Sequence, residues 1–486
     1  MTTLSKSDRN ALDKAVQKAR DISEEGARKA LISLGVSDEK KPEHLSDEQA
    51  ELRRRIRVVL RRLGTEEELI RSVAYEQWHR MLFARFLIEN DLLIHPEHQV
   101  SVSFEDLVEL AHDEQVDPWE LAARYASDML PGIFKQDDPL LKITYAPEDR
   151  NALRDILAQI PGDTFRTSDA LGWTYQFWQT KKKDEVNKSG VKIGAAELPS
   201  QTQLFTEPYM VHFLLDNSLG AWWAGKRLKE EDLKTATSEE ELRQKASLPG
   251  VPLTYLRFVQ DENGVWTPAS GTFSEWPDQL SELKMLDPCC GSGHFLVATL
   301  LMLVPMRMEM EGLSAGKAVD AVLSENLHGL EIDERCVEIA AFALALAAWT
   351  YPDAGGYHPL PDMPVACSGL AITSKKEEWV ALAGDNQDLA FALDLLYDEF
   401  AQAPVLGSLI DPMRRFGEGK IIPITWDQIA PMLDKVLATK RDEEREGIGV
   451  VAHGLARAAG MLAGRYHLIA TNVPYLVRLK QHEGIK

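Results

Sequence analysis

The sequence predicts an α/β protein in which a doubly wound parallel sheet follows an all-α N-terminal domain. Two changes of pattern along the chain predict this order. From residue 8 to about 135, apolar residues recur at spacings of three and four, which is typical of helices that bury one face. From residue 285 onward, a strand, a Gly-rich turn, a helix and a second strand follow one another, and this succession builds a parallel sheet.

The length of 486 residues and a hydrophobic fraction of 44% allow several domains with cores of ordinary size. Between the helical part and the sheet, the sequence is charge-rich and then contains two short β-like pieces, "TYLRFVQ" and "GVWTPAS". The predicted parts are a helical domain over residues 1–195, a short segment over 196–225, a charged linker or insertion over 226–280 and a partial sheet domain over 281–486.

Three stretches are predicted to be buried helices. Four aromatic residues lie close together in "ALGWTYQFWQTKKKDEV" (170–186), and we expect them in a core rather than in a ligand site. The longest apolar runs, "FLVATLLMLVPM" (295–306) and "AAFALALAAW" (340–349), are shorter than the roughly 20 residues that a membrane span requires. No membrane partner is therefore predicted.

The net charge of −22 argues against a general affinity for polyanions, because nucleic-acid binders normally neutralise phosphates with a basic surface. Any contact with DNA must then be local. Two basic islands are candidates, "LRRRIRVVLRRLG" (52–64) and "KKKDEVNK" (181–188). For each island, a solvated helix face is an equally good interpretation.

The cysteines do not predict a disulfide scaffold or a metal site. Cys289, Cys290, Cys336 and Cys367 have no even framework of spacings, which favours a reducing, cytoplasmic setting. Adjacent cysteines cannot form a CxxC clamp, and no second pair with zinc spacing follows them. The N-terminus also lacks the apolar stretch of a signal peptide.

The first candidate site lies in "MLDPCCGSGHFL" (285–296). A strand ends here, and a helix begins directly after the glycines. A Gly-rich turn between strand and helix lets backbone N–H groups and the helix N-terminus approach a ligand closely. The cysteines then act as spacers.

A carboxylate at the end of the next strand strengthens this prediction. The strand Leu327–Ile332 in "LHGLEIDERCVEIAAFALAL" delivers Glu331, which can accept hydrogen bonds from both hydroxyls of a ribose. Asp333 fits the N-cap of the following helix. We therefore predict that Glu331 binds a nucleoside and that Asp333 caps the helix.

The third element is "YHLIATNVPYLVRLKQ" (466–481), in which a strand delivers Asn472, Val473, Pro474 and Tyr475 at its carboxyl end. The Asn472 carbonyl oxygen and the next backbone carbonyl can accept both hydrogens of an exocyclic amino group, and Tyr475 can stack on the ring that bears it. This arrangement aims the nitrogen lone pair at a methyl sulfonium, where positioning and electrostatics dominate catalysis.

These segments resemble adenine-specific, S-adenosylmethionine-dependent DNA methyltransferases. "DPCCGSGHFL" is similar to their cofactor motif, and "TNVPY" resembles their catalytic Asn-Pro-Pro-Tyr motif. "LPSQTQLFTEPYMVHFLLDNSLG" (198–220) resembles the segment that closes over the cofactor. The resemblance is closest to the large methylases of bacterial phage defence, namely the PglX-type enzymes of BREX and the adenine methylase of DISARM.

The resemblance implies a methyltransferase sheet, S-adenosylmethionine as methyl donor and the N6 amino group of adenine in double-stranded DNA as acceptor. It implies these cofactor-binding residues: Phe205, Thr206, Asp287, Pro288, Gly291, Gly293, Glu331 and Ser368. It implies these catalytic residues: Asn472, Val473, Pro474 and Tyr475. Other subunits of a defence system are the implied partners, and the target adenine would be flipped out of the duplex.

The sequence departs from the family in two ways. Val473 stands where the family usually has proline, so the backbone carbonyl is retained but the fixed φ is lost. The family's fold also continues well beyond the catalytic motif, whereas eleven residues follow Tyr475 here. We expect the missing region to be supplied in cis or as a second chain, and the isolated chain to be inactive on DNA.

Two other functions are compatible with these residues. A methyltransferase acting on a protein amide could use the same Asn-Pro-x-Tyr geometry to hold a glutamine side chain, although such enzymes are small and lack a long helical leader. A non-catalytic subunit that binds the cofactor or DNA within a defence complex would fit the acidic charge. The presence of Asn472 and Tyr475 counts against it.

Overall fold

The computed structural model describes residues 3–194, 197–202, 206–372, 375–412 and 443–473. The chain forms two compact units, Met1–Ser189 and Gly190–Lys486. Helices make up the regular structure of the described residues in the first unit, and the second unit combines helices with strands. The mixed α/β class that the sequence predicts is thus confirmed.

Polar side chains set the starts of several helices in the first unit. Ser46 accepts a hydrogen bond from the Gln49 backbone N–H (3.2 Å), while the Gln49 side chain accepts from the Ser46 N–H (3.0 Å). Asp117 similarly accepts from the first N–H groups of the helix that follows it. The helices are α1 (Lys6–Ser33), α2 (Asp47–Leu63), α3 (Glu66–Glu89), α4 (Phe104–Glu114), α5 (Pro118–Met129), α6 (Pro147–Gln159), the 3₁₀ turn η1 (Gly162–Arg166) and α7 (Ala170–Ser189).

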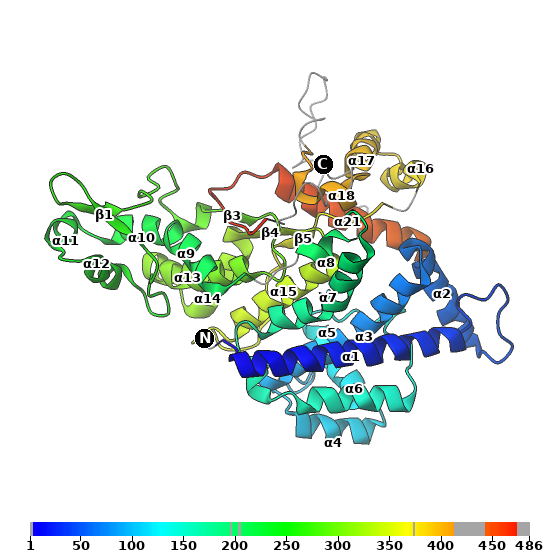
Figure 1. The fold of residues 1–486 in the computed structure, drawn as a ribbon. Helices are drawn as coiled ribbons and strands as arrows, with labels where there is room; N and C mark the ends of the chain where they lie inside the picture. Colours follow the sequence, from blue (N-terminus) through cyan, green and yellow to red (C-terminus); the bar gives the residue numbers. More distant parts are fainter. Residues whose placement is uncertain (1–2, 195–196, 203–205, 373–374, 413–442, 474–486) are drawn as a thin grey trace. The chain divides into compact units, whose positions relative to one another are not determined.

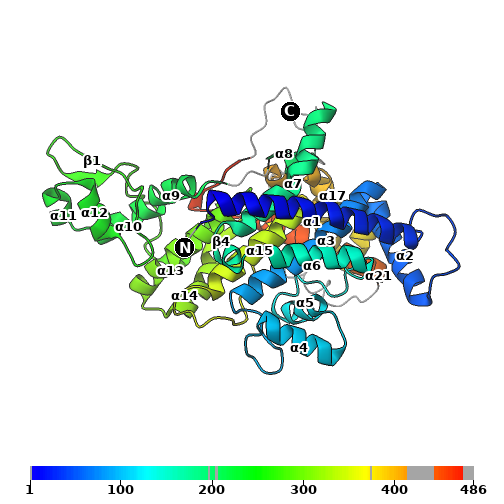
Figure 2. The same cartoon turned by 60° about the horizontal axis from the view of Figure 1, so that its bottom comes forward.

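The core of the first unit lies along α1, which packs against α3, α6 and α7 (Figures 1 and 2). The aromatic residues of α7, which are Trp173, Tyr175, Phe177 and Trp178, are all buried. Trp178 meets His79 of α3 edge to face, with ring centroids 5.0 Å apart. The prediction that these four aromatics belong to a core is confirmed.

The second unit begins with short helices and an antiparallel strand pair and continues with a parallel sheet. Its elements before the sheet are α8 (Leu198–Thr202), α9 (Pro208–Asp216), α10 (Leu219–Arg227), α11 (Glu230–Thr235), α12 (Glu239–Ala246), β1 (Phe258–Gln260), β2 (Trp266–Pro268) and η2 (Leu280–Glu282). The elements from the sheet onward are β3 (Met285–Asp287), α13 (His294–Glu311), α14 (Ala315–Ala321), η3 (Val322–Asn326), β4 (Leu327–Glu331), α15 (Glu334–Trp349), β5 (Val365–Cys367), α16 (Lys376–Val380), η4 (Ala381–Ala383), α17 (Gln387–Phe400), α18 (Ala403–Leu406), η5 (Gly407–Leu409), α21 (Glu443–Ala463) and β6 (Leu468–Ile469).

Four parallel strands form the sheet in the order β5-β4-β3-β6. The chain moves outward from β3 through β4 to β5 and then returns to the other side of β3 to form β6. Met285 of β3 lies opposite both Leu327 of β4 and Leu468 of β6. The direction of winding therefore reverses at β3. β3, β4 and β6 lie where the sequence predicts strands.

Alternate residues of the strands face two different apolar layers. Met285, Leu327 and Val365 share one cluster with buried side chains of α13 and α15. Leu286, Leu330 and Ala366 share the other with buried side chains of α17 and α21. This alternation is what the two-residue period of a strand produces when helices cover both faces of a sheet. Burial of α13 and α15, which contain the two longest apolar runs, is confirmed.

The charge-rich residues 226–280 contain α11 and α12 and the antiparallel pair β1–β2. Ion pairs tie this region together, for example between Arg257 and Glu239 (2.9 Å) and between Lys245 and Asp232 (3.1 Å). In the part of the chain that the structure describes, no helix has the length and apolarity needed to cross a membrane.

Candidate functional site

The candidate site lies at the carboxyl ends of β3, β4 and β6. Asp287 is the last residue of β3, Glu331 is the last residue of β4, and Asn472 follows β6. Because β4 and β6 flank β3 and run parallel to it, these ends meet at one edge of the sheet. Open α/β sheets bind ligands at this edge, at the strand where the winding reverses.

The Gly-rich turn connects β3 to α13 through a sharp change of backbone direction. Gly291 and Gly293 have φ values of +52° and +86°, a region that favours glycine. A Cβ on Gly293 would lie 3.1 Å from the Ala340 Cα, so the turn packs closely on α15. A Cβ on Gly291 would have no described atom within 4 Å. The turn is thus packed at Gly293 and open at Gly291, as a ligand cradle requires.

Glu331 links the end of β4 to this turn. One carboxylate oxygen accepts from the Gly291 N–H (2.8 Å), and the other accepts from the N–H groups of Ile332 (2.9 Å) and Asp333 (3.2 Å). The side chain is 7% exposed. Three backbone donors thus hold the carboxylate at the mouth of the turn. No local sequence pattern indicates the contact between Glu331 and Gly291.

Asp333 caps α15, as the sequence predicts. Its carboxylate accepts from the Arg335 N–H at 3.0 Å. Glu331 and Asp333 therefore make different contacts, although they are two residues apart. The ribose-binding role of Glu331 stays a prediction.

Asp287 is a second buried carboxylate beside Glu331. It is 1% exposed and accepts from the Cys289 N–H at 3.1 Å. Burial raises the pKa of the Asp287 carboxyl to about 7, and the charge of Glu331 also favours the protonated form. Burial likewise raises the pKa of Glu331 to about 7, although the Gly291 N–H stabilises its ionised form. A cation bound here would favour ionisation of both groups.

Thr206 and Asn472, which are far apart in sequence, meet at this edge. The Asn472 Nδ2 donates to the Thr206 Oγ1 at 3.2 Å. Thr206 is buried, whereas Asn472 and Val473 are exposed. With its amide nitrogen held in this way, Asn472 has its Oδ1 available to accept a hydrogen bond from another group.

Ser368 follows β5 and is 1% exposed. Its hydroxyl has no hydrogen-bond partner among the described residues. Its N–H donates to the backbone oxygen of Glu331 at 2.7 Å, so Ser368 lies next to the end of β4. A buried hydroxyl normally has a partner, and a bound polar ligand would supply one here.

Of the remaining predicted residues, the structure describes only Pro288. Pro288 follows Asp287 directly at the start of the turn. Phe205, Pro474 and Tyr475 lie outside the described residues. The structure therefore brings Asp287, Gly291, Glu331, Ser368, Thr206 and Asn472 to one end of the sheet.

The cysteines beside the turn are packing residues. All four are free thiols, and Cys290 is buried. Burial raises the pKa of Cys289 to about 11 and keeps its thiol protonated at neutral pH. Within the described ranges, no group of three or more His, Cys, Asp and Glu side chains could hold a metal ion.

Both basic islands have structural contacts within the first unit. Arg53 and Arg57 of α2 donate to backbone oxygens of the loop after α1, at Gly35 (2.9 Å) and Val36 (3.1 Å) respectively. Lys182 of the second island pairs with Glu68 at 3.2 Å. These contacts favour the interpretation that both islands are helix faces that stabilise the unit, and not dedicated DNA contacts. Arg61 and Arg62 at the end of α2 are nevertheless exposed.

Comparison with known proteins relates this site to DNA methyltransferases. The family described as MmeI, DNA-methyltransferase domain, matches residues 267–354, which include Asp287, the Gly-rich turn and Glu331. The adenine-specific methyltransferase PglX of Lacticaseibacillus casei (strain Zhang) is 24% identical over 489 residues. This match covers 88% of the chain and 38% of the relative.

The predicted resemblance to PglX-type adenine-specific methyltransferases is confirmed. Two further PglX-type relatives match shorter segments. The adenine-specific methyltransferase BrxX of Escherichia coli O9:H4 (strain HS) is 31% identical over 196 residues, which are 40% of the chain and 15% of that protein. PglX of Streptomyces coelicolor is 43% identical over 68 residues, which are 14% of the chain and 6% of that protein. The chain thus spans well under half the length of these PglX-type relatives.

Proposed function

We propose that the chain belongs to an enzyme that transfers a methyl group from S-adenosylmethionine to the exocyclic N6 of adenine in DNA. The enzyme would mark host DNA in the cytoplasm within a phage-defence system. The observation that carries the proposal is the contact of Asn472 with Thr206 at the sheet edge that also holds Glu331 and the Gly-rich turn. A site for a nucleoside and a site for an amino group are thereby adjacent.

The residues at this edge fit S-adenosylmethionine. The open side of Gly291 gives room for a ligand, and the buried Ser368 hydroxyl lacks a partner among the described residues. Asp287 and Glu331 provide two buried carboxylates for its positive charges and ribose hydroxyls. The donor supplies a methyl group on a sulfonium. In this proposal the sheet is the doubly wound methyltransferase sheet, with its ligand at the point where the winding reverses.

On the acceptor side, Asn472 is the residue that holds the target amino group. The Asn472 Oδ1 and the backbone carbonyl of Val473 accept the two amino hydrogens, so that the nitrogen lone pair faces the methyl group. Tyr475 stacks on the adenine that is flipped from the duplex. Held amino hydrogens favour direct attack, in which the amino nitrogen bonds to the methyl carbon, the carbon–sulfur bond breaks and the nitrogen loses a proton to water. No thiol takes part.

The test is the methylation state of genomic DNA in cells that carry the gene and in cells from which it is deleted. We expect N6-methyladenine at a defined DNA sequence in the first and none at that sequence in the second. Restoring the gene with Asn472→Ala should leave the site unmethylated. A mark that survives this substitution would favour a different catalytic residue, and equal patterns in both strains would favour a non-catalytic subunit.

Thr206 is expected to act as a positioning residue for Asn472. Thr206→Val keeps the shape but removes the hydroxyl that accepts from Asn472, so methyl transfer to duplex DNA should fall about three- to tenfold, as for one neutral hydrogen bond. Thr206→Ser retains the hydroxyl and should keep most of the activity. Affinity for S-adenosylmethionine is measured on the same variants. A loss of affinity instead of turnover would mean that Thr206 serves the cofactor.

The affinity for S-adenosylmethionine is expected to rise with pH between about 6 and 8. Asp287 and Glu331 have pKa values of about 7, and a cationic ligand prefers their ionised forms. Each group that must lose its proton weakens binding by about tenfold per pH unit below its pKa. Calorimetry across this range should show weaker binding and a shallower pH dependence for Asp287→Asn. If affinity depended on pH equally in Asp287→Asn and in the unchanged chain, Asp287 would not be one of the groups that must ionise for binding.

A further inference from the structure

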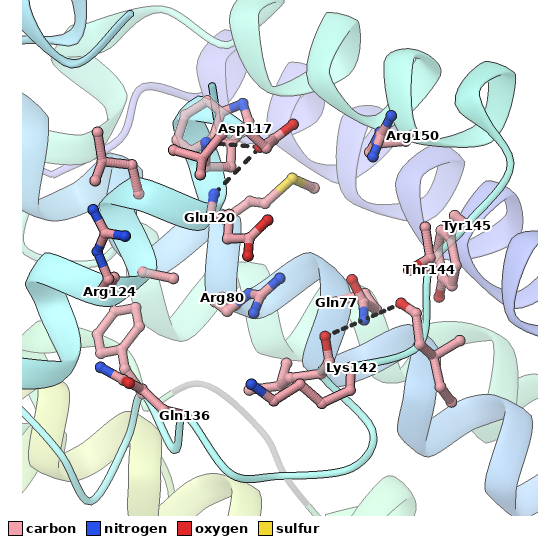
Figure 3. A pocket seen from close by; sticks show the side chains of 18 of the residues that line it. Gln77, Arg80, Asp117, Glu120, Arg124, Gln136, Lys142, Thr144, Tyr145 and Arg150 are labelled. Atoms are coloured by element: carbon pink, nitrogen blue, oxygen red, sulfur yellow. Dashed lines mark hydrogen bonds between the residues drawn. The ribbon is translucent and has the colours of Figure 1, made fainter. Parts of the chain in front are cut away.

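The helical unit contains a cavity of about 370 Å³ that the methyltransferase proposal does not use. It lies among α3, α5, α6 and the loop between α5 and α6, and Figure 3 shows the side chains around it. Small-molecule sites in proteins have volumes of this order. Its size and its position within a helical core suit a compact ligand rather than a duplex.

The cavity lining is basic in a strongly acidic chain. Its basic side chains are Arg80, Arg124, Lys135, Lys142, Arg150 and Arg154. Its acidic side chains are Asp117 and Glu120. The formal charge of the lining is therefore six minus two, or +4, whereas the chain carries −22. Such a concentration of positive charge within an acidic protein favours an anionic ligand.

The acidic side chains do not compensate all of this charge. Asp117 forms an ion pair with Arg154, and Glu114 forms one with Arg124. Glu120 attracts Arg80 electrostatically, but burial still lowers the pKa of the Arg80 guanidinium. Arg150 has no ion-pair partner among the residues that the structure describes.

Several donors of these arginines are buried without an acceptor. The Nε atoms of Arg80, Arg150 and Arg154 have no hydrogen-bond partner among the described residues. Figure 3 shows Arg80 near the middle of the cavity, with Lys142 and Arg150 around the same space. Buried guanidinium donors are normally satisfied, and phosphate oxygens match their planar geometry.

The Gln77 side chain helps to hold the loop between α5 and α6 that lines the cavity. The Gln77 Nε2 donates to the backbone oxygens of Leu140 (3.1 Å), Leu141 (3.3 Å) and Ile143 (3.0 Å). Tyr145 continues the wall and contacts the Ser23 hydroxyl at 3.0 Å. These contacts fix the loop before α6.

We propose that this cavity binds a small molecule that carries one or more phosphate groups, with Arg80 and Arg150 as its principal ligands. The inference does not depend on the methyltransferase proposal, because it uses no residue of that site. It gives the helical unit a binding function of its own.

The test is calorimetry on the purified chain with inorganic phosphate, pyrophosphate and adenosine triphosphate as probes, and with a short DNA duplex as the alternative source of phosphate. At least one small probe should bind and raise the Tm. Arg80→Met and Arg150→Gln should each weaken that binding by about tenfold or more, because each removes a charge-assisted contact. Arg61→Gln, which removes an exposed charge of the same unit, should leave it unchanged.

The Tm without ligand separates a binding role from a structural one. Arg80→Met removes a buried charge that forms no ion pair with a described residue, although Glu120 and Glu76 attract it, so its Tm without a probe should equal or exceed that of the unchanged chain. A marked drop would show that Arg80 is structural and would overturn the proposal. Failure of all three small probes would also overturn it, as would binding of the duplex alone.

Discussion

Replacement of Gly291 by valine is expected to abolish binding of S-adenosylmethionine. Gly291 has φ +52°, where a β-branched residue is strained, and its open side is where the cofactor would approach the turn. The substitution also disturbs the N–H that donates to Glu331. We expect affinity to fall by at least about 100-fold, which corresponds to ~2.7 kcal/mol, in a calorimetric titration.

Two control variants separate the effect of Gly291 on cofactor binding from the effects of backbone strain and of the neighbouring thiol. Gly264, in the turn between β1 and β2, has φ +76° and no described atom within 4 Å of a Cβ, so Gly264→Val carries similar strain at a distant turn. Cys290→Ala removes a buried thiol next to Gly291. Both variants should bind the cofactor nearly as well as the unchanged chain. Equal losses for Cys290→Ala and Gly291→Val would mean that the cysteine is a ligand.

Glu331→Gln is expected to weaken S-adenosylmethionine binding by roughly ten- to a hundredfold. The carboxylate accepts from three backbone N–H groups, and a glutamine amide would place a donor against at least one of them. The substitution also removes the charge that would hold the ribose hydroxyls. Charge-assisted hydrogen bonds contribute about 1.5–3 kcal/mol each, so the combined effect should be visible by calorimetry.

Asp333→Asn is the matched control, because it makes the same chemical change two residues away. Asn caps helices about as well as Asp does, and the contact of Asp333 with the Arg335 N–H should persist. We expect little change in affinity and in Tm. If Asp333→Asn caused the larger loss of binding, the roles assigned to the two carboxylates would have to be exchanged.

The sheet and its Gly-rich turn were predictable because local sequence specifies them. Short apolar runs that end at Asp287 and Glu331 predict buried strands, and glycines at positions with positive φ leave few alternatives to a tight turn. The capping role of Asp333 follows from the same local rules.

Contacts between distant segments were not predictable from these patterns. The bond from Asn472 to Thr206 joins residues 266 positions apart, and it depends on β6 lying beside β3. The basic cavity of the helical unit is similar, since Arg80 and Arg150 come from different helices. No run of basic residues marks the cavity, whereas the islands at 52–64 and 181–188 are evident in the sequence.

The strand order also has a consequence for how the site comes into being. β3, β4 and β5 follow one another within Met285–Cys367, whereas β6 begins at Leu468 and pairs with β3 across a long intervening stretch. Pairings between nearby segments form faster than pairings between distant ones. Pulse-labelled hydrogen exchange should therefore show protection at Gly329, whose N–H donates to Pro364, before Ala470, whose N–H donates to Leu286. The half that would bind the methyl donor would then be in place before the half that selects what is methylated.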